Sequence, residues 1–257
     1  MLNKCLFTLV LTIGLFSLYC DTSSTEPEVT QETIAEKHGQ LRVKGTHIID
    51  CNGDSIVLRG MSLFWSQWGG DYYNKTTLRW LRDDWKCTVI RAAIGIEHDG
   101  YLKNRETELA KCIAVIDACV ELGLYVIVDW HDHHAEKHLA EAKAFFAFIA
   151  EQYGHLPNLI YEIYNEPLDL SWTQVLKPWA EQVITEIRTY DSDNIIVTGT
   201  PNWSQDVEDV IGHRIDDENV VYTLHFYSST HKKRLRDKAF LAMANNIPLF
   251  VTEWGLS

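Results

Sequence analysis

The sequence predicts an α/β fold built on a parallel sheet, and three observations support this prediction. Seven short apolar runs with strand character alternate with segments of helical periodicity. Strands that are apolar throughout are typical of parallel sheets that helices cover on both faces. Polar residues stand in or just after five of the runs, and in parallel α/β folds ligand-binding groups gather at the carboxyl ends of strands. Polar groups from five strands at one rim favour a closed barrel over an open doubly wound sheet.

The first predicted elements precede the main sheet. Residues 41–43 and 47–49 are short strand candidates, and Asn52-Gly53 is a strong signal for a tight turn that leads into residues 56–58. This pattern predicts a hairpin before the main fold.

The seven strands of the sheet are predicted from apolar runs that polar or turn-forming segments separate. They are residues 56–64, 88–94, 124–130, 159–164, 195–199, 220–226 and 247–252. Two of the intervening segments carry apolar residues on one helical face. These residues are Leu109, Ile113, Ile116 and Val120 in the first segment, and Trp172, Val175, Trp179, Val183 and Ile187 in the second. We therefore expect Trp172 and Trp179 to lie in the core.

Two acids, Glu166 and Glu253, each directly follow an apolar run. A single acid in this position is equally well explained as a helix N-cap or an ion-pair partner. Two acids on one rim favour glycoside hydrolysis, which needs a protonated carboxyl and a carboxylate, roughly 5 to 5.5 Å apart when configuration is retained. The other polar residues of the rim are Arg91, Asp129, His131, Asn165, His225 and Tyr227.

Four motifs around these residues closely resemble the cellulases of glycoside hydrolase family 5. They are Ile-Tyr-Asn-Glu-Pro at 163–167, Asp-Trp-His at 129–131, His-Phe-Tyr at 225–227 and Val-Thr-Glu-Trp-Gly at 251–255. Each motif alone is moderately specific, but their joint order and spacing are highly specific. The resemblance runs from about Gln40 to the end of the chain, and residues 60–66 and 199–205 resemble a bacterial or invertebrate endoglucanase subgroup.

The resemblance implies a TIM-type (β/α)8 barrel that hydrolyses internal β-1,4-glucosidic bonds of cellulose with retention, by double displacement and without a cofactor. It implies Glu166 as acid/base and Glu253 as nucleophile. Arg91 can hold Glu253 ionised, and Tyr227 can orient its second oxygen. Asn165 can hydrogen-bond the sugar 2-hydroxyl. We expect Glu166 to keep its proton at working pH through partial desolvation and the nearby charge of Glu253.

Five further residues are expected to bind the glucan. His131 and His225 can hydrogen-bond glucose hydroxyls or the acid/base, the alternative for each being a structural histidine. Trp65, Trp68 and Trp203 follow the first and fifth strands, where aromatic faces can stack on glucose rings. The alternative for each tryptophan is a place in the core.

Composition and charge exclude several classes of protein. The 257 residues are 46% hydrophobic, which is enough for a sizeable core and shows no fibrous or low-complexity bias. The net charge of -13 disfavours nucleic acid and anionic lipid as partners, so we expect a monomer whose partner is a β-1,4-glucan. Residues 59–62, after the start of the first strand, form no glycine-rich phosphate loop, which disfavours nucleotide binding.

A metal-dependent barrel hydrolase is the alternative enzyme. The sequence His131-x-His133 stands at a strand end, where the metal sites of such barrels also begin. These sites take further His and Asp ligands from later strands, but here the later strand ends carry Glu166 and Glu253 with only His225. We therefore expect no metal.

The sequence ends four residues after Glu253, before an eighth strand and the seventh and eighth helices of a barrel. We expect seven strands, a sheet that lacks the last helix, strand and helix, and no counterpart of the family's cleft tryptophan after strand eight. An incomplete sequence is the favoured explanation. The alternative is a natural truncation that is inactive and at most a weak glucan binder.

The N-terminal segment predicts export. Lys4 precedes an apolar run over residues 5–19, which is typical of a secretory signal and short for a membrane span. We expect a signal peptide over residues 1–20, a flexible linker over 21–38 and the catalytic domain over 39–257. The expected product is a secreted, extracellular protein with no membrane segment after signal cleavage.

Overall fold

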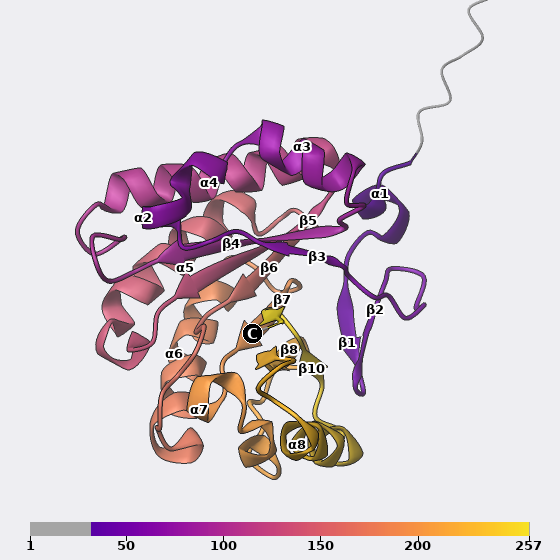
Figure 1. The fold of residues 1–257 in the computed structure, drawn as a ribbon, viewed down its shortest axis with the longest axis vertical. Coiled ribbons are helices and arrows are strands. Elements are labelled where there is room, and N and C mark those ends of the chain that lie inside the picture. Colours follow the sequence, from indigo (N-terminus) through magenta and orange to yellow (C-terminus); the bar gives the residue numbers. More distant parts are fainter. Residues whose placement is uncertain (1–31, 257) are drawn as a thin grey trace, which may run out of the picture. The chain divides into compact units, whose positions relative to one another are not determined.

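Seven parallel strands form one curled sheet in the structure, a computed structural model that describes residues 32–256 (Figure 1). From one edge to the other they are β3 (Gly60–Ser62), β4 (Val89–Gly95), β5 (Tyr125–His131), β6 (Leu159–Glu162), β7 (Ile195–Thr198), β8 (Val220–Thr223) and β10 (Leu249–Phe250). Each lies within or overlaps one of the seven predicted runs, so the predicted fold class and strand number are confirmed. Among the described residues, no strand joins the edge strands β3 and β10.

Helices connect successive strands and cover the outer face of the sheet (Figure 1). The longer helices are α3 (Lys75–Asp83), α4 (Arg105–Leu122), α5 (Leu139–Tyr153), α6 (Lys177–Arg188) and α8 (Lys233–Ala244). The shorter ones are α2 (Ser66–Gly69), η1 (Gly70–Tyr72), η2 (Ala135–Lys137), the π-helical turn η3 (Trp172–Leu176), α7 (Pro201–Ser204) and η4 (Val207–Val210). None of the described helices has the length and apolar character needed to cross a bilayer.

The buried face of α4 differs from the predicted one. Ile116 is buried as expected, but Leu109, Ile113 and Val120 are only half-buried. The apolar residues of α4 that face the sheet are Cys112, Val115, Ile116, Ala118, Cys119 and Leu122. The buried face is shifted from the predicted one, although Leu109 and Val120 still pack against the core. Cysteine and alanine, which the prediction did not count, also pack as apolar side chains.

The N-terminal elements cover the amino end of the sheet. α1 (Ile34–His38) begins with a capping box formed by Thr33 and Glu36. β1 (Arg42–Lys44) and β2 (His47–Ile49) form the predicted hairpin. Apolar residues of these elements pack with strand residues on the inner side of the sheet: Ala35, Leu41, Ile48, Ile56, Val89, Tyr125, Ile127, Ile160, Ile195 and Val221. Because α1 is part of this core, the linker prediction is wrong for residues 33–38, while residues 1–31 lie outside the described part.

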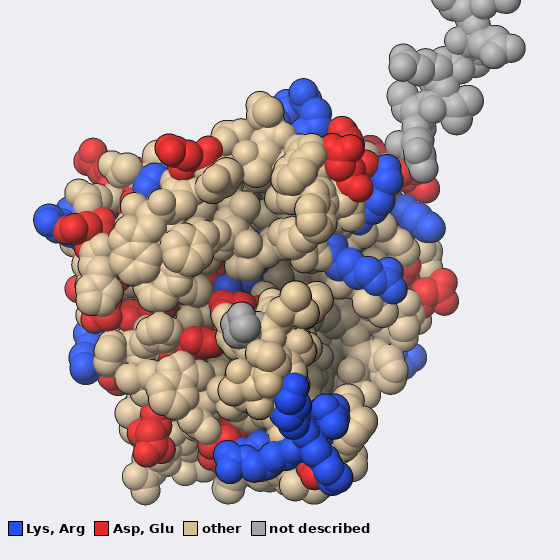
Figure 2. Space-filling model, viewed as in Figure 1, with Lys and Arg blue, Asp and Glu red and all other residues tan. Residues whose placement is uncertain are grey.

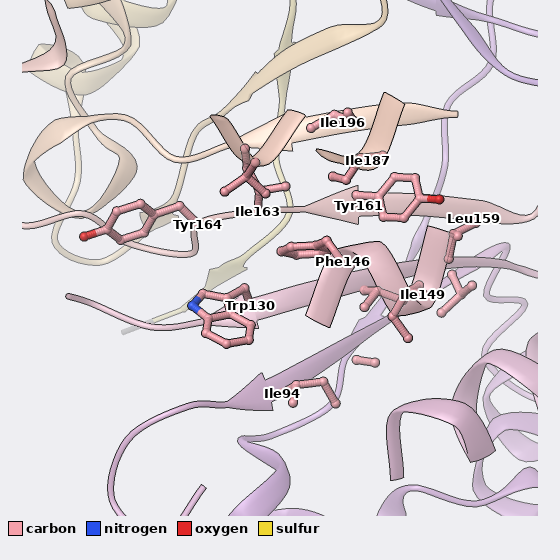
Figure 3. Close-up of a cluster of buried hydrophobic side chains, with 14 of the residues drawn as sticks. Ile94, Trp130, Phe146, Ile149, Leu159, Tyr161, Ile163, Tyr164, Ile187 and Ile196 are labelled. Atoms are coloured by element: carbon pink, nitrogen blue, oxygen red, sulfur yellow. The ribbon is translucent and has the colours of Figure 1, made fainter. Parts of the chain in front are cut away.

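The main core lies between the sheet and its helices (Figure 3). Phe146 of α5 is fully buried, with its ring centroid 6.3 Å from that of Trp130 and 6.1 Å from that of Tyr161. Truncating such a phenylalanine to alanine costs about 3–5 kcal/mol. Trp172 and Trp179 are buried as predicted. This core fixes β4, β5 and β6, which carry or precede four of the predicted site residues: Arg91, His131, Asn165 and Glu166.

A hollow separates the two edges of the sheet. It has a volume of about 510 Å³ and is lined by residues of β3, β4 and β10 and by the segment that follows β10, with Arg91 and Glu253 on its wall. Figure 2 shows it between the elements that Figure 1 labels β3 and β10. Two short strands, β9 (Phe226–Tyr227), which follows β8, and β11 (Trp254–Gly255), which follows β10, pair in parallel. This pairing fixes the segment that carries Glu253.

The chain is acidic overall, but the face shown in Figure 2 carries a basic region at α8. Lys and Arg side chains gather over α8 in Figure 2, where Lys232, Lys233, Arg234 and Arg236 stand in or next to the first turns. Acidic side chains and further Lys and Arg side chains are distributed over the rest of this face (Figure 2). The net charge of -13 therefore includes a local positive patch at one helix.

Candidate active site

The two predicted catalytic acids lie next to each other at the carboxyl ends of the strands. Glu166 follows β6 and Glu253 follows β10. Glu166, Glu253 and His225 each offer one ligand atom, and these three atoms all lie within 4.8 Å of one another. The side chains of Glu166 and Glu253 are 14% and 20% exposed, so both are open to a ligand. The parallel register of the sheet therefore brings together two acids that are 87 positions apart, the difference between 253 and 166.

Arg91 lies at the centre of the site. This buried side chain donates from Nε to Glu162 Oε2 at 2.7 Å and from Nη1 to Glu253 Oε2 at 3.2 Å. Its Nη2 lies 2.9 Å from Asp129 Oδ2 and donates to Asn165 Oδ1 at 2.7 Å. Burial alone would lower the pKa of Arg91, but the surrounding carboxylates raise it, so the guanidinium stays charged. A buried charge requires such partners. Here the guanidinium links β5, β6 and the segment after β10 through Asp129, Glu162 and Glu253.

Glu253 is held as a carboxylate. Tyr227 Oη donates to its Oε1 at 2.5 Å, while Arg91 binds its other oxygen. Burial would raise the pKa of Glu253, but the charges of Arg91 and His225 and the tyrosine hydrogen bond lower it. The structure thus brings Arg91 and Tyr227 onto Glu253 in the arrangement predicted from sequence.

Glu166 contacts two histidines, and its protonation differs from the expectation. His225 Nδ1 lies 2.9 Å from Glu166 Oε1, and His133 Nε2 lies 3.2 Å from Glu166 Oε2. Burial would raise the pKa of Glu166, but the two histidines lower it to about 2. Burial would lower the pKa of His225, but its interactions with Glu162, 3.6 Å from Nε2, and with Glu166 raise it to about 9. In the free site the proton therefore resides on His225, and the expected retention by Glu166 through desolvation and Glu253 is wrong.

Asn165 and His131 are both buried next to Arg91. The Oδ1 atom of Asn165 accepts from Arg91, which fixes the amide, while its buried Nδ2 has no hydrogen-bond partner among the described residues. His131 Nδ1 lies 2.6 Å from Asp129 Oδ2. Burial and the charge of Arg91 lower the pKa of His131 to about 3, so its imidazole is neutral. Asn165 therefore retains a donor, and His131 is held by Asp129.

The three predicted sugar-stacking tryptophans line the surroundings of the rim and not the core. Trp65 packs against His131 with ring centroids 4.2 Å apart and stacks on Trp68 at 5.1 Å. Trp68 is 57% exposed. Trp203 is 45% exposed and lies in a left-handed turn with φ 57°, where its N–H donates to the carbonyl of Pro167, next to Glu166. The ring of Trp65 also lies 5.6 Å from that of His133, which contacts Glu166, so the tryptophans offer aromatic surface around the rim.

Sequence analysis does not identify Glu162 and Thr252, which complete the site. Glu162 is fully buried at the end of β6, where Arg91 binds it. An acid inside an otherwise apolar strand is a signal for such a residue. Thr252 Oγ1 contacts Glu162, His225 and Thr223, but a threonine beside a strand gives no signal of its own, because threonine is common in sheets.

Two groups of side chains in the described residues bring potential metal ligands within 4.8 Å of one another. They are Glu97, Asp132 and His138, and Glu166, His225 and Glu253. The pair His131 and His133 belongs to neither group, and the two histidines contact different acids, Asp129 and Glu166. The donor set therefore does not favour the metal-dependent alternative based on this pair.

Comparison with known proteins agrees with this geometry. Residues 49–257 match the family model described as cellulase (glycosyl hydrolase family 5). The chain belongs to this family. The family 5 chain is 49% identical over 200 residues to endoglucanase Z of Dickeya dadantii, covering 76% of this chain and 47% of that protein. It is 43% identical over 230 residues to endoglucanase N of Pectobacterium atrosepticum, covering 88% and 51%. The chain thus spans about half the length of these relatives.

Solved structures resemble the family 5 chain closely. A structure from Cytophaga hutchinsonii is 54% identical with a TM-score of 0.86, covering 86% of this chain and 73% of that chain. The catalytic domain of Thermobifida fusca endoglucanase Cel5A is 35% identical with a TM-score of 0.83, covering 87% and 76%. A variant of that domain is solved in complex with cellotetraose.

Proposed function

We propose that this chain carries the catalytic centre of a retaining endo-β-1,4-glucanase that hydrolyses internal bonds of cellulose by double displacement. The observation that carries this proposal is the separation of Glu166 and Glu253, whose nearest ligand atoms lie within 4.8 Å. This separation is close to the roughly 5–5.5 Å of retaining sites. It fits less well with inverting sites, which keep their carboxyl groups roughly 6.5–9.5 Å apart to admit a water.

Glu253 acts as the nucleophile. Its carboxylate, kept ionised by Arg91 and Tyr227, attacks the anomeric carbon as the glycosidic bond breaks. The departing oxygen takes a proton from Glu166 and leaves as a hydroxyl, so a covalent glycosyl ester remains on Glu253. Glu166 then removes a proton from water, whose oxygen attacks the same carbon and frees the Glu253 carboxylate.

Glu166 acts together with His225. In the free site the proton resides on His225 Nδ1, 2.9 Å from Glu166 Oε1. As negative charge develops on the leaving oxygen, the proton moves through Glu166 to the sugar. The pair supplies the acid even though the pKa of Glu166 alone is low.

The binding groups suit a neutral polysaccharide. Asn165 Nδ2 is the free donor for the sugar 2-hydroxyl, because Arg91 occupies Asn165 Oδ1. Trp65, Trp68 and Trp203 supply aromatic faces for glucose rings. The names of the relatives, endoglucanases Z and N, support a glucan as the substrate.

The test is hydrolysis of carboxymethylcellulose by the full chain, measured as the release of reducing ends. Proton NMR of the products should detect the β-anomer first. Glu253→Gln should abolish turnover, whereas Glu121→Gln, a substitution at an exposed acid that pairs with Lys75, should leave it unchanged. First appearance of the α-anomer, or normal rates with Glu253→Gln, would contradict the proposal.

Glucan binding without turnover is the second candidate. One observation favours it: the sheet is open between β3 and β10, and the hollow there reaches Glu253. Titration calorimetry with cellotetraose separates the two, because a binder that does not turn over gives a stable binding isotherm and no shorter products.

The protein is further proposed to be a secreted monomer. The apolar run over residues 5–19 supports export, although these residues lie outside the described part. N-terminal sequencing of protein recovered from the medium checks export. Its mass by light scattering checks that it is a monomer.

A further inference from the structure

A chain of buried hydrogen bonds lies behind the Glu166 and His225 pair. His225 Nε2, on the far side of the ring from Glu166, lies 2.9 Å from Thr252 Oγ1. Thr252 Oγ1 lies 2.7 Å from Glu162 Oε1 and 2.5 Å from Thr223 Oγ1. All four side chains belong to buried residues, so water does not replace these partners.

The strand register creates this chain. Thr223 is the last residue of β8, and its partner on β10 is Phe250. Thr252, two residues beyond Phe250, therefore comes close to Thr223 and to His225, two residues beyond Thr223. Glu162 is the last residue of β6 and completes the group from across the inside of the sheet.

The number of hydrogens in this group fixes the direction of each bond. Glu162 is ionised, because Arg91 binds both of its oxygens at 2.7 and 3.3 Å, and a carboxylate only accepts. Thr252 lies 2.7 Å from it and must therefore donate its only hydrogen to Glu162. The remaining lone pairs of Thr252 Oγ1 then accept from Thr223 Oγ1 and from His225 Nε2.

We infer that Thr252, oriented by Glu162, is a positioning residue that keeps a proton on His225 Nε2. As a consequence, the pair formed by Glu166 and His225 holds one further proton that can be transferred. With Nε2 protonated, the 2.9 Å contact between Nδ1 and Glu166 Oε1 requires a second proton, on either atom. The competing tautomer, with a hydrogen on Nδ1 only, satisfies the same contact but leaves Glu166 without a proton to give.

The charges around His225 favour this state. The pair with one transferable proton is neutral, whereas the competing tautomer leaves a net negative charge next to Glu253. The charged and titratable groups that face the pair are Arg91 of β4, Asp129 of β5, Glu162 of β6, His133, and Glu253 after β10. Thr252 and Glu162 stabilise the imidazolium form of His225. The pair therefore keeps its transferable proton below its apparent pKa and loses it as pH rises through that value.

The direct test is ¹⁵N NMR of histidine-labelled protein, with the His225 signals assigned by their loss in His225→Gln. Wild-type His225 should show a protonated Nε2 at every pH below and above its titration. Thr252→Val should lower the pH of that titration by about one unit, a tenfold change equivalent to one hydrogen bond to a charged group. Thr252→Ser should restore it. Thr200→Val, at a buried hydroxyl that has no hydrogen-bond partner within residues 32–256, should leave it unchanged.

The kinetic test rests on the proposed function and is separable from the NMR test. If the chain hydrolyses aryl cellobiosides, Thr252→Val should move the basic limb of kcat/KM to lower pH by the same amount. Its loss of rate should grow as the leaving group becomes poorer. An unprotonated Nε2 in the wild type, or an unshifted His225 titration in Thr252→Val, overturns the inference. A shifted titration in a chain that hydrolyses nothing sustains the inference and contradicts the proposed function.

Discussion

Arg91 Nη1 donates to Glu253 Oε2 at 3.2 Å, and this bond joins the interior of the sheet to the proposed nucleophile. The same guanidinium binds both oxygens of Glu162. Glu162 in turn accepts from Thr252, which contacts His225. One buried cation thereby contacts the proposed nucleophile directly and is linked to Glu166, the proposed acid, through three side chains, Glu162, Thr252 and His225.

Arg91→Lys should destabilise the protein and weaken the nucleophile together. A lysine cannot make the bidentate contact with Glu162, and breaking a buried ion pair costs about 3–5 kcal/mol. Urea unfolding measures this loss. Arg82→Lys, at an exposed pair with Asp83, is the control and should change the free energy of unfolding by less than about 0.5 kcal/mol. Equal effects of the two substitutions would contradict the central role of Arg91.

Glu166→Gln and Glu253→Gln should differ in their dependence on the leaving group. Glutamine at 166 cannot protonate the departing oxygen, so cellotetraose should lose about a thousandfold or more in kcat/KM, while a dinitrophenyl cellobioside should still release its phenol. Glutamine at 253 removes the nucleophile and should abolish release from both substrates. Stopped-flow absorbance at the phenolate band measures this difference. A dinitrophenyl burst with Glu253→Gln would reverse the assignment of roles.

The rim residues could be predicted from sequence because their positions depend on strand order alone. Glu166, Asn165 and Glu253 follow apolar strands, and the carboxyl ends of parallel strands meet at one edge whatever the details of packing. The group behind the rim could not be predicted in this way. The contact of Thr252 with Glu162 depends on the register between three strands and on atomic positions within a fraction of an ångström.

Neither the protonation state of Glu166 nor the buried face of α4 could be predicted from the sequence, and the reasons are related. Desolvation alone predicts a raised pKa for Glu166, and only the positions of His133 and His225 reverse it. The face of α4 depends on how closely small side chains such as Cys112 approach the sheet. In both cases several opposing contributions of similar size are summed, and the outcome depends on distances.

The shifts of Glu162, Glu166 and His225 place the greatest stability between about pH 4.5 and pH 6.5, and the pKa of His131, which falls from 6.5 to about 3 on folding, moves the maximum toward pH 6.5. The pKa values of Glu162 and Glu166 fall from 4.5 to about 2 on folding, so their stabilisation is present above about 4.5 and is lost as pH falls toward 2. The pKa of His225 rises from 6.5 to about 9, so its stabilisation is complete below about 6.5 and is lost as pH rises through 9. Melting temperatures measured across pH 3–10 test this window. His225→Gln should flatten the alkaline decline, and an unchanged decline would contradict it.

Trp68→Ala should weaken glucan binding without lowering stability. Trp68 is 57% exposed and stacks on Trp65, so its removal leaves the core intact but takes away an aromatic face beside the rim. We expect the dissociation constant for cellotetraose to rise about tenfold, equivalent to about 1.4 kcal/mol of lost stacking. Calorimetry with Glu253→Gln as the background measures it without turnover. Trp80→Ala is the matched control, because Trp80 of α3 is 51% exposed and packs against Trp85, away from the rim. If both substitutions weakened binding equally, the loss would be due to exposed aromatic surface in general and Trp68 would not be part of the binding site.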